Sequence, residues 1–269
     1  MASHFAMRKP LVVIKLGGAA ITDKKNIYAP RISVIKIVAK QLLAIEENFS
    51  IIIVHGAGSY GHIPVKKYGL TKGFSNPKQI AGLIQTKSKL LELEMTLNQI
   101  LREHDLPVIS MLASDCITAR KGRIKACDLE GFKRWLGLGC IPMIGGDIVP
   151  DRANGFAIIS GDQIAVYLSV KLGASKLIFG TDVGGVFDSN PNLKATAKLL
   201  PTVHVNSVAR MSRTNQYVTD VTGGMGGKLT ESITALRNNV PVFVVTLLEH
   251  DRLLDVAYGR KTVCSEIVL

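Results

Sequence analysis

Three charged residues beside glycines could do chemistry on anionic groups. Lys15 stands inside the apolar run LVVIK just before paired glycines, Asp162 follows a Ser-Gly pair, and Lys228 ends the stretch TGGMGGK. A lysine within an apolar strand costs desolvation free energy unless it pairs with an anion. Two lysines that neutralise charge, an aspartate that holds them and free glycine amides together indicate phosphoryl transfer. No general base is required if the acceptor is already an anion.

A further glycine-rich turn, VHGAGSYGH at 54–62, follows an apolar strand pattern. Backbone N–H groups at a strand-to-helix junction attract anions, so we expect a negatively charged group there. We interpret His62 as a ligand for a phosphate or phosphonate, and His55 as a structural residue at the strand end. None of the glycine turns has the Walker pattern or a dinucleotide fingerprint, which disfavours P-loop enzymes and Rossmann oxidoreductases.

The sequence also leaves open a purely structural role, without any function in catalysis, for each of these residues. Lys15 could reach solvent from a strand end, Asp162 could simply cap a helix, and Lys228 could be a solvated helix residue. Glycines also serve ordinary tight turns. The turns KLGGAA, HGAGSYGH, SGDQ and TGGMGGK occur beside predicted strand or helix ends, and four together favour a ligand site.

Strand and helix patterns alternate along the chain, and these elements must position the charged residues. Short β-branched runs predict strands at 11–16, 50–55, 107–112, 140–145, 176–181, 241–246 and 262–268. Amphipathic patterns predict helices from 32, at about 77–104, at about 129–138, from 162 and from 226. Hairpins are expected at 120–126 and 147–159. The alternation predicts an α/β fold with a parallel sheet covered by helices on both faces.

Composition restricts the class of protein. The 269 residues are 47% hydrophobic and 20% charged, and no Pro/Ser linker divides them, which favours two lobes that share one sheet. Apolar runs fall short of the roughly 20 residues of a membrane helix. The basic start MRKPLVVI is interrupted by Lys15 and lacks a cleavage site, so we expect a cytoplasmic protein without membrane contact.

Cysteine spacing and net charge exclude further classes. The four cysteines are scattered, which predicts reduced structural thiols rather than a zinc site or a disulfide scaffold. The net charge of +12 is compatible with nucleic acid, an anionic small substrate or a basic surface. Because no recognition motif or basic arm is present, we expect no nucleic-acid partner.

The motifs KLGGAAITDK, VHGAGSYGH, SGDQIAVYL, TDVGGVFDSNP and VTGGMGGK occur in the order seen in the amino acid kinase superfamily, which the sequence resembles from about Met7 to Leu269. The histidine that ends GSYGH, together with ITDK, looks like the isopentenyl phosphate kinases within it. The resemblance implies a three-layer αβα sandwich with a mainly parallel central sheet. It also implies a single domain over 8–269, with a phosphate-acceptor lobe at about 8–173 and a nucleotide lobe at about 174–269.

The same resemblance implies an activity, cofactors and partners. The expected reaction is ATP-dependent phosphorylation of isopentenyl phosphate to the diphosphate, a step of isoprenoid biosynthesis, with ATP and Mg²⁺ as cofactors and a homodimer as the assembly. The alternatives are a kinase of the same fold for fosfomycin, UMP or an amino-acid carboxylate, and a non-catalytic protein that binds oxyanions or nucleotides. Both lysines are present, which disfavours the non-catalytic alternative.

Carried over residue by residue, the resemblance implies specific roles. Lys15 and Lys228 would grip the transferred phosphoryl group, Asp162 would orient them, Lys24 would clamp a phosphate and His62 would hydrogen-bond the acceptor phosphate. Further acceptor-site residues would be Gly56, Ala57, Gly61 and Gly161. Further nucleotide-site residues would be Gly17, Gly18, Ala19, Gly58, Asp182, Phe187 and Gly224. No protein ligand for the metal is assigned.

Three positions depart from the family pattern. Ala19 stands where a serine is usual, Ala57 where a glycine is usual, and Gln163 where the second acid of GDD is usual. Ala19 removes a hydroxyl near the phosphates and Gln163 removes a possible magnesium contact, so these two departures bear on rate and metal coordination more than on reaction type.

The resemblance places the acceptor's hydrocarbon tail against the helix at 77–104. We expect most of the apolar residues of this helix to pack in the core and one or two to close the far end of the pocket. The candidates are Ile80, Leu83, Ile84, Leu90, Leu91 and Met95.

Overall fold

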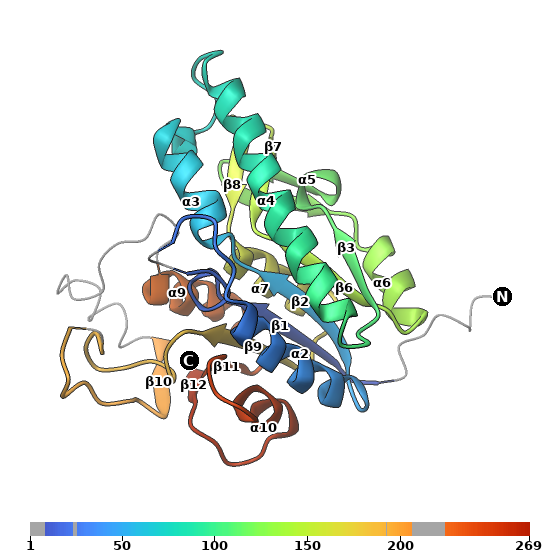
Figure 1. Ribbon diagram of the computed structural model, residues 1–269, viewed down its shortest axis with the longest axis vertical. Helices are drawn as coiled ribbons and strands as arrows, with labels where there is room; N and C mark the ends of the chain where they lie inside the picture. The colour runs from blue at the N-terminus through green and yellow to red at the C-terminus, as the bar shows by residue number, and fades with distance from the viewer. Residues whose placement is uncertain (1–8, 24–25, 192, 206–223) are drawn as a thin grey trace.

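An eight-stranded sheet runs through the computed structural model, which describes residues 9–23, 26–191, 193–205 and 224–269 (Figure 1). Its strands, in spatial order, are β10 (Thr202–His204), β12 (Ser265–Val268), β11 (Val242–Thr246), β9 (Lys176–Thr181), β1 (Leu11–Leu16), β2 (Ser50–His55), β6 (Ile141–Gly145) and β3 (Val108–Met111). All neighbours are parallel except β11 and β12, which pair antiparallel. The predicted mainly parallel sheet is confirmed.

Helices cover both faces of this sheet and make three layers. One face packs against α2 (Ile32–Glu46), α4 (Gln79–Arg102) and α10 (Arg252–Tyr258). The other packs against α6 (Glu130–Gly137), α7 (Gly161–Lys171) and α9 (Gly224–Arg237). The β-branched strand residues are buried on both faces, as a parallel sheet between two helical layers requires. The αβα sandwich is therefore confirmed.

The alternation of side chains along β1 determines where Lys15 points. Ile14 packs in the core on the α2 side of the sheet, and Val13 packs in the core on the α7 side. Because successive strand residues face opposite sides, Lys15 faces the same way as Val13, toward α7. Lys15 is 5% exposed, so the strand delivers an ammonium group into a nearly dry site.

A smaller four-stranded sheet, in the order β5-β4-β7-β8, consists of two hairpins. Its strands are β4 (Ile117–Arg120), β5 (Arg123–Cys127), β7 (Asp147–Asp151) and β8 (Gly155–Ile159). The predicted hairpins at 120–126 and 147–159 are confirmed. The β4–β5 turn has positive φ at Lys121 (53°) and Gly122 (75°), the backbone of a tight two-residue hairpin turn.

The Asp151 side chain links the two hairpins through hydrogen bonds. Its carboxylate accepts the N–H groups of Lys121 at 3.1 Å and Gly122 at 2.8 Å, and also those of Ala153 and Asn154 in its own hairpin. Burial raises the pKa of Asp151, but the backbone N–H donors outweigh burial and hold the pKa below its usual range. The β4–β5 turn is therefore held against β7 by an ionised carboxylate at neutral pH.

All predicted strands and helices are present, with ends shifted by up to three residues. The sequence patterns missed α1 (Gly18–Ile21), α3 (Gly58–Lys67), α5 (Ala113–Cys116), α10, β10 and the 3₁₀ turn η1 (Leu70–Lys72). In α3 the glycines of GSYGH and Pro64 hide a helix, and packing against α4 outweighs their low helix propensity.

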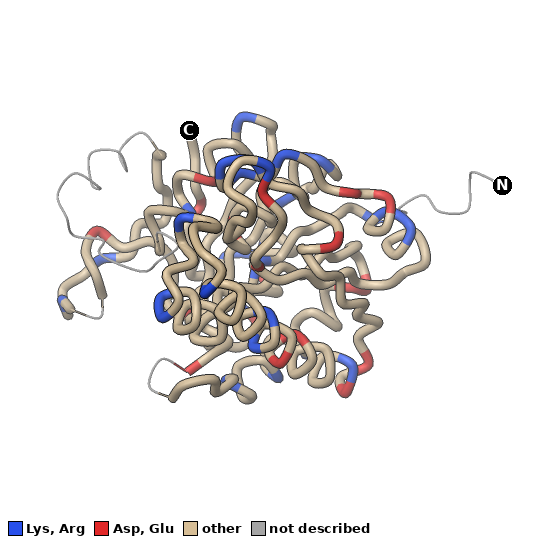
Figure 2. The backbone as a smooth tube through the Cα atoms, turned by 90° about the horizontal axis from the view of Figure 1, so that it is seen from above, with Lys and Arg blue, Asp and Glu red and all other residues tan. Residues whose placement is uncertain are grey.

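The structure also bears on the predictions about surface charge, cysteines and membrane helices. Lys and Arg are distributed around the molecule and interspersed with acidic residues (Figure 2). The four cysteines are free thiols, as predicted. In the ranges that the structure describes, no helix has the length and apolar character to span a bilayer. The division into lobes at about 173 stays a prediction.

Candidate active site

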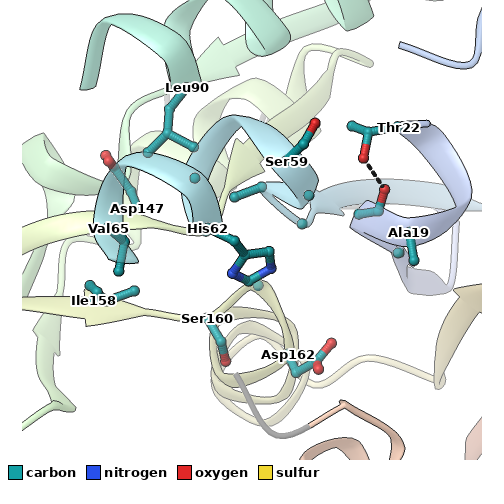
Figure 3. Close-up of a pocket in the computed structure, with 18 of the residues that line it drawn as sticks. Ala19, Thr22, Ser59, His62, Val65, Leu90, Asp147, Ile158, Ser160 and Asp162 are labelled. Carbon is teal, nitrogen blue, oxygen red and sulfur yellow. Dashed lines mark hydrogen bonds between the residues drawn. The ribbon is translucent and has the colours of Figure 1, made fainter. Parts of the chain in front are cut away.

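A cavity of about 380 Å³ opens at the carboxyl ends of β1, β2 and β9. The turn after β1, the N-terminal turns of α3 and α7, and Lys228 in α9 line it. Figure 3 labels side chains that converge there from the turn after β1, from α3 and from the start of α7. In an open parallel sheet, this edge is the usual place for a ligand.

Lys15, Asp162 and Lys228 form one buried ion cluster in this cavity. The Lys15 Nζ lies 2.8 Å from Asp162 Oδ1, and the Lys228 Nζ lies 3.0 Å from Asp162 Oδ2. The three side chains are 6%, 7% and 13% exposed in chain order. Burial raises the pKa of Asp162, but the two ammonium groups outweigh burial and hold that pKa below its usual range. One carboxylate therefore fixes two ammonium groups beside the cavity.

This geometry excludes the simple roles of a helix cap for Asp162 and of solvated side chains for Lys15 and Lys228. Ser160, rather than Asp162, caps α7, because the Ser160 Oγ accepts the N–H of Gln163 at 3.2 Å. Lys15 and Lys228 do not extend into solvent but point at the same carboxylate. A structural cap or a strand-end lysine would not require this convergence.

Two helix N-termini face the cavity. The ten-residue α3 begins at Gly58 and α7 begins at Gly161, and both residues line the cavity. The first N–H groups of a helix have no acceptor within the helix, and the helix dipole adds partial positive charge there. With the two lysines, these helix ends make the cavity suited to an anion that carries several charges.

Glycine is sterically required where the turns after β1 and β2 touch. A Cβ on Gly18 would lie 2.5 Å from the Gly58 nitrogen. Gly58 has φ +51°, and a Cβ there would lie 2.1 Å from Thr22 Oγ1. The Thr22 hydroxyl donates to the Gly18 carbonyl at 2.8 Å and closes the turn (Figure 3). The two turns can therefore approach closely only if both residues lack side chains.

Gly17 requires a correction of its expected role. We expected it to cradle nucleotide phosphates, but its N–H donates to the Gly180 carbonyl at 2.8 Å in the neighbouring strand β9. This N–H is part of the sheet and is not free for a phosphate. Gly17 still lines the cavity, where its lack of a side chain leaves room.

His62 projects from α3 into the middle of the cavity (Figure 3). Val65 and Ile158 lie on one side of its ring and Ala19 on the other. The remaining residues expected at the acceptor also line the cavity, namely Gly56, Ala57, Gly61 and Gly161. The structure therefore brings His62 and the ion cluster to one cavity, as the sequence predicts.

The residues expected at the nucleotide divide into two groups. Gly18, Ala19, Gly58 and Asp182 line the cavity with Gly17. Phe187 and Gly224 lie outside the set of described residues that line it. Lys24 lies outside the described residues.

His55 is buried behind the cavity. Its Nε2 hydrogen-bonds the Glu94 carboxylate of α4, and a Cβ on Gly145 would lie 2.5 Å from its ring. Burial lowers the pKa of His55, but Glu94 outweighs burial, so the pKa lies above its usual value. The interpretation of His55 as structural is confirmed, because it joins β2 to α4.

Gln163 binds the small sheet and not the cavity. Its Oε1 accepts the Ile124 N–H at 2.7 Å, and its Nε2 donates to the Gly122 carbonyl at 3.4 Å. The residue that stands in place of an acid therefore attaches α7 to the β4–β5 turn. No local sequence pattern predicts this contact, since the hairpin lies about forty residues away along the chain.

The far end of the cavity is apolar with one ion pair. Val65, Leu90 and Ile158 line it beside Asp147, whose carboxylate pairs with the Lys87 ammonium (Figure 3). Leu90 and Asp147 also line a smaller cavity, which continues toward α4 and β3. These two side chains therefore form the wall between the two spaces.

Most of the six α4 residues considered for the tail are not in the core. Ile80, Ile84, Leu91 and Met95 are 50%, 59%, 38% and 71% exposed, which corrects the expectation of core packing. Leu83 is partly buried beside Val65, and Leu90 lines the cavity. The face of α4 away from α3 and the sheet remains open, so helical spacing alone overstated its burial.

The sequence also matches known proteins over most of its length. Residues 10–246 match the amino acid kinase family. The isopentenyl phosphate kinase of Methanothermobacter thermautotrophicus is 32% identical over 239 residues, which cover 86% of this chain and 88% of that protein. The isopentenyl phosphate kinase of Thermoplasma acidophilum is 28% identical over 260 residues, which cover 96% of this chain and 100% of that protein.

A solved structure is similar as well. A crystal structure of an isopentenyl phosphate kinase superposes with a TM-score of 0.82 at 27% identity, over 96% of this chain and 100% of that one. The amino acid kinase family uses ATP. With the fold, the glycine turns and a match over residues 10–246, this chain belongs to the amino acid kinase family.

Proposed function

We propose that this protein transfers the γ-phosphoryl group of ATP to isopentenyl phosphate and releases isopentenyl diphosphate and ADP. The observation that carries the proposal is the position of His62, between Asp162, which binds both lysines, and the apolar end of the cavity at Val65 and Ile158. An acceptor with an anionic head and a short hydrocarbon tail fits this order of groups. The similarity to isopentenyl phosphate kinases supports the same acceptor.

The chemistry requires charge neutralisation more than proton transfer. A phosphate oxygen of the acceptor forms a bond to the γ-phosphorus, and the bond to the β-phosphate oxygen breaks with its electron pair leaving on ADP. The attacking oxygen is already anionic, so no base is required. Lys15 and Lys228 neutralise the oxygens of the moving group, and Asp162 keeps both ammonium groups in place.

We assign the remaining residues to the binding of the two substrates, ATP and the acceptor. We assign Gly18, Ala19, Gly58, Asp182, Phe187 and Gly224 to ATP, with Gly17 making room, and Gly56, Ala57, Gly61 and Gly161 to the acceptor phosphate. Lys24 is assigned to a phosphate from the sequence alone. The predicted homodimer stays a prediction.

The donor set of the cavity does not make a protein cage for Mg²⁺. Asp162 binds two lysines, Asp147 is paired with Lys87, and Gln163 binds the hairpin. The other described carboxylates that line the cavity are Asp23 and Asp182. Within the described ranges, no group of three or more His, Cys, Asp and Glu side chains could hold a metal ion. Mg²⁺ commonly keeps its waters and binds through substrate phosphates, so we propose that it enters with ATP and assign it no protein ligand.

A panel of acceptors tests the proposal. Release of ADP is measured with isopentenyl phosphate, UMP, fosfomycin, glutamate and aspartate, and we expect the highest kcat/KM with isopentenyl phosphate. Turnover of another acceptor without turnover of isopentenyl phosphate would reject the proposed substrate. No release of ADP with any acceptor of the panel would favour a non-catalytic binding protein.

Changing His62 is expected to weaken acceptor binding selectively. His62→Ala should raise the acceptor KM about ten- to a hundredfold, because a hydrogen bond to a charged group contributes about 1.5–3 kcal/mol. His62→Gln should keep part of the contact. The KM for ATP should stay within about twofold in both variants, because the contact is with the acceptor. His104→Ala, in the turn after α4, is the matched control. Unchanged acceptor kinetics in His62→Ala would mean that His62 has only a structural role.

Shortening Leu90 is expected to change chain-length preference. Leu90→Ala removes part of the wall between the two cavities, so the ratio of kcat/KM for geranyl phosphate to that for isopentenyl phosphate should rise. Each additional buried methylene contributes about 0.8 kcal/mol, or about fourfold in this ratio. Met95→Ala, on the exposed face of the same helix, is the control. An unchanged ratio in a folded Leu90→Ala variant would show that the tail leaves by another route.

A further inference from the structure

The β4–β5 turn contacts both helices that carry the ion cluster. On one side it receives the Gln163 side chain of α7, through Ile124 and Gly122. On the other side Arg123 forms a two-point ion pair with Glu231 of α9, in which Nη1 donates to Oε1 and Nη2 donates to Oε2 at 2.8 Å. The turn therefore connects α7 and α9 from outside the cavity.

The contacts close a ring around the cluster. Gln163 is the neighbour of Asp162 on α7, and Glu231 follows Lys228 by three residues on α9, which places it on the adjoining turn of that helix. Inside the ring, Lys228 contacts Asp162 directly. Outside it, α7 and α9, which also pack directly against each other in the core, are joined through the β4–β5 turn. The turn therefore adds a polar constraint on the distance between the two helices at the cavity.

The Arg123–Glu231 ion pair is better suited to fixing the position of α9 than to stabilising the fold. Its side chain is 61% exposed, and an exposed ion pair contributes only about 0–1 kcal/mol to stability. The planar guanidinium nevertheless binds a carboxylate at two points and fixes direction as well as distance, which the single ammonium of a lysine cannot do. Glu231 is 15% exposed and part of a regular helix, so this constraint passes to the helix backbone.

The position of the Lys228 ammonium depends on α9. Its side chain is a flexible chain of four methylene carbons. Its Nζ reaches Asp162 only if the separation between α9 and α7 does not change. A misplacement of about 1 Å can cost about a hundredfold in rate. A small rotation of α9 could therefore lower catalysis without unfolding the protein.

We propose that Arg123 is a positioning residue of the phosphoryl-transfer site, and that it acts through Glu231 to hold α9 and the Lys228 ammonium in register with Asp162. Arg123 is the first residue of β5, directly after the turn that Asp151 and Gln163 hold through Gly122, so its backbone is fixed in place. Arg123 lies outside the set of described residues that line the cavity, and it contacts no reacting group. The inference rests on the proposed function in that Lys228 contacts the transferred phosphoryl group.

The test compares Arg123→Gln, Glu231→Gln and the double variant. Each single variant should lower kcat about tenfold, with the acceptor KM unchanged within about twofold, since geometry is lost and not acceptor contacts. The double variant should be no worse than either single variant, because both remove the same interaction. Arg123→Lys should recover part of kcat. The melting temperature should change by no more than about 2 °C, as for an exposed pair.

A matched control and a second readout separate the possible outcomes. Arg134→Gln breaks another exposed ion pair, to Glu130 within α6, and should leave kcat unchanged. If the protein phosphorylates another acceptor of the panel but not isopentenyl phosphate, the proposed function fails, and the same ratios are measured with that acceptor. Without any acceptor, a crystal structure of Arg123→Gln should show the Lys228 Nζ withdrawn from Asp162. Single variants with kcat within twofold of the unchanged protein, additive effects in the double variant, or an unmoved Lys228 would overturn the proposal.

Discussion

Replacing Lys15 or Lys228 by alanine is expected to lower kcat by about 10²–10³-fold while the protein remains folded. Each ammonium group lies within 3.0 Å of Asp162 at the edge of the cavity. In the reaction that we propose, charge develops there on the phosphoryl group during transfer. An interaction that is strongest in the transition state affects kcat more than KM. The measurement is steady-state kinetics with ATP and isopentenyl phosphate, with circular dichroism to verify folding.

Lys176 supplies the matched control for these two lysines. It is a partly buried lysine at the start of β9, and its Nζ donates to the carbonyls of Val256 and Ala257 at the end of α10. Lys176→Ala should lower the melting temperature but leave kcat unchanged, because it lies at the opposite end of β9 from the cavity. A Lys15→Ala or Lys228→Ala variant with nearly full kcat would show that the residue is assigned wrongly.

Changing Asp162 to asparagine is expected to lower both activity and stability. The amide keeps the shape of the side chain but leaves two buried ammonium groups without a counter-charge, and removing one partner of a buried ion pair costs about 3–5 kcal/mol. The ammonium groups then separate or lose protons, so kcat should fall at least about a hundredfold. Asp105→Asn, at an exposed position in the turn after α4, is the control.

The stability effect of Asp162 should depend on pH in a defined direction. The pKa of Asp162 is lower in the folded protein than in the unfolded chain, where it is about 3.9. The carboxylate therefore stabilises the fold above the unfolded pKa, and this contribution is lost as the pH falls through the folded pKa. Urea unfolding should show a large difference between the unchanged protein and Asp162→Asn at pH 7, and a smaller difference below about pH 4. A difference that is independent of pH would contradict an ionised Asp162.

Much of the site could be predicted because its parts are local. The strand of Lys15, the glycines after it and the helix that begins at Gly161 each follow from short-range patterns. The period of two along β1 also determines that Lys15 shares a face with Val13. What local pattern could not give was the partner of that ammonium, because Asp162 lies about 150 residues away along the chain.

The sequence was misleading where packing outweighs local preference. Gly58, Gly61 and Pro64 indicated a turn, yet these residues belong to α3, because packing against α4 compensates for their low helix propensity. In the other direction, the apolar residues Ile84 and Met95 indicated burial but are exposed on the outer face of α4. Which face of a helix is covered depends on the neighbouring elements.

The sequence by itself determined the reaction class, the layered fold and the identity of the charged residues, because residue type, glycine spacing and periodicity are properties of short segments. The tertiary structure alone decided how those segments meet. Gln163 replaces an acid and Arg123 lies on a distant hairpin, yet folding brings both to the helices that carry Asp162 and Lys228. Such contacts join residues far apart in the chain, and their geometry depends on the packing of whole elements rather than on any local pattern.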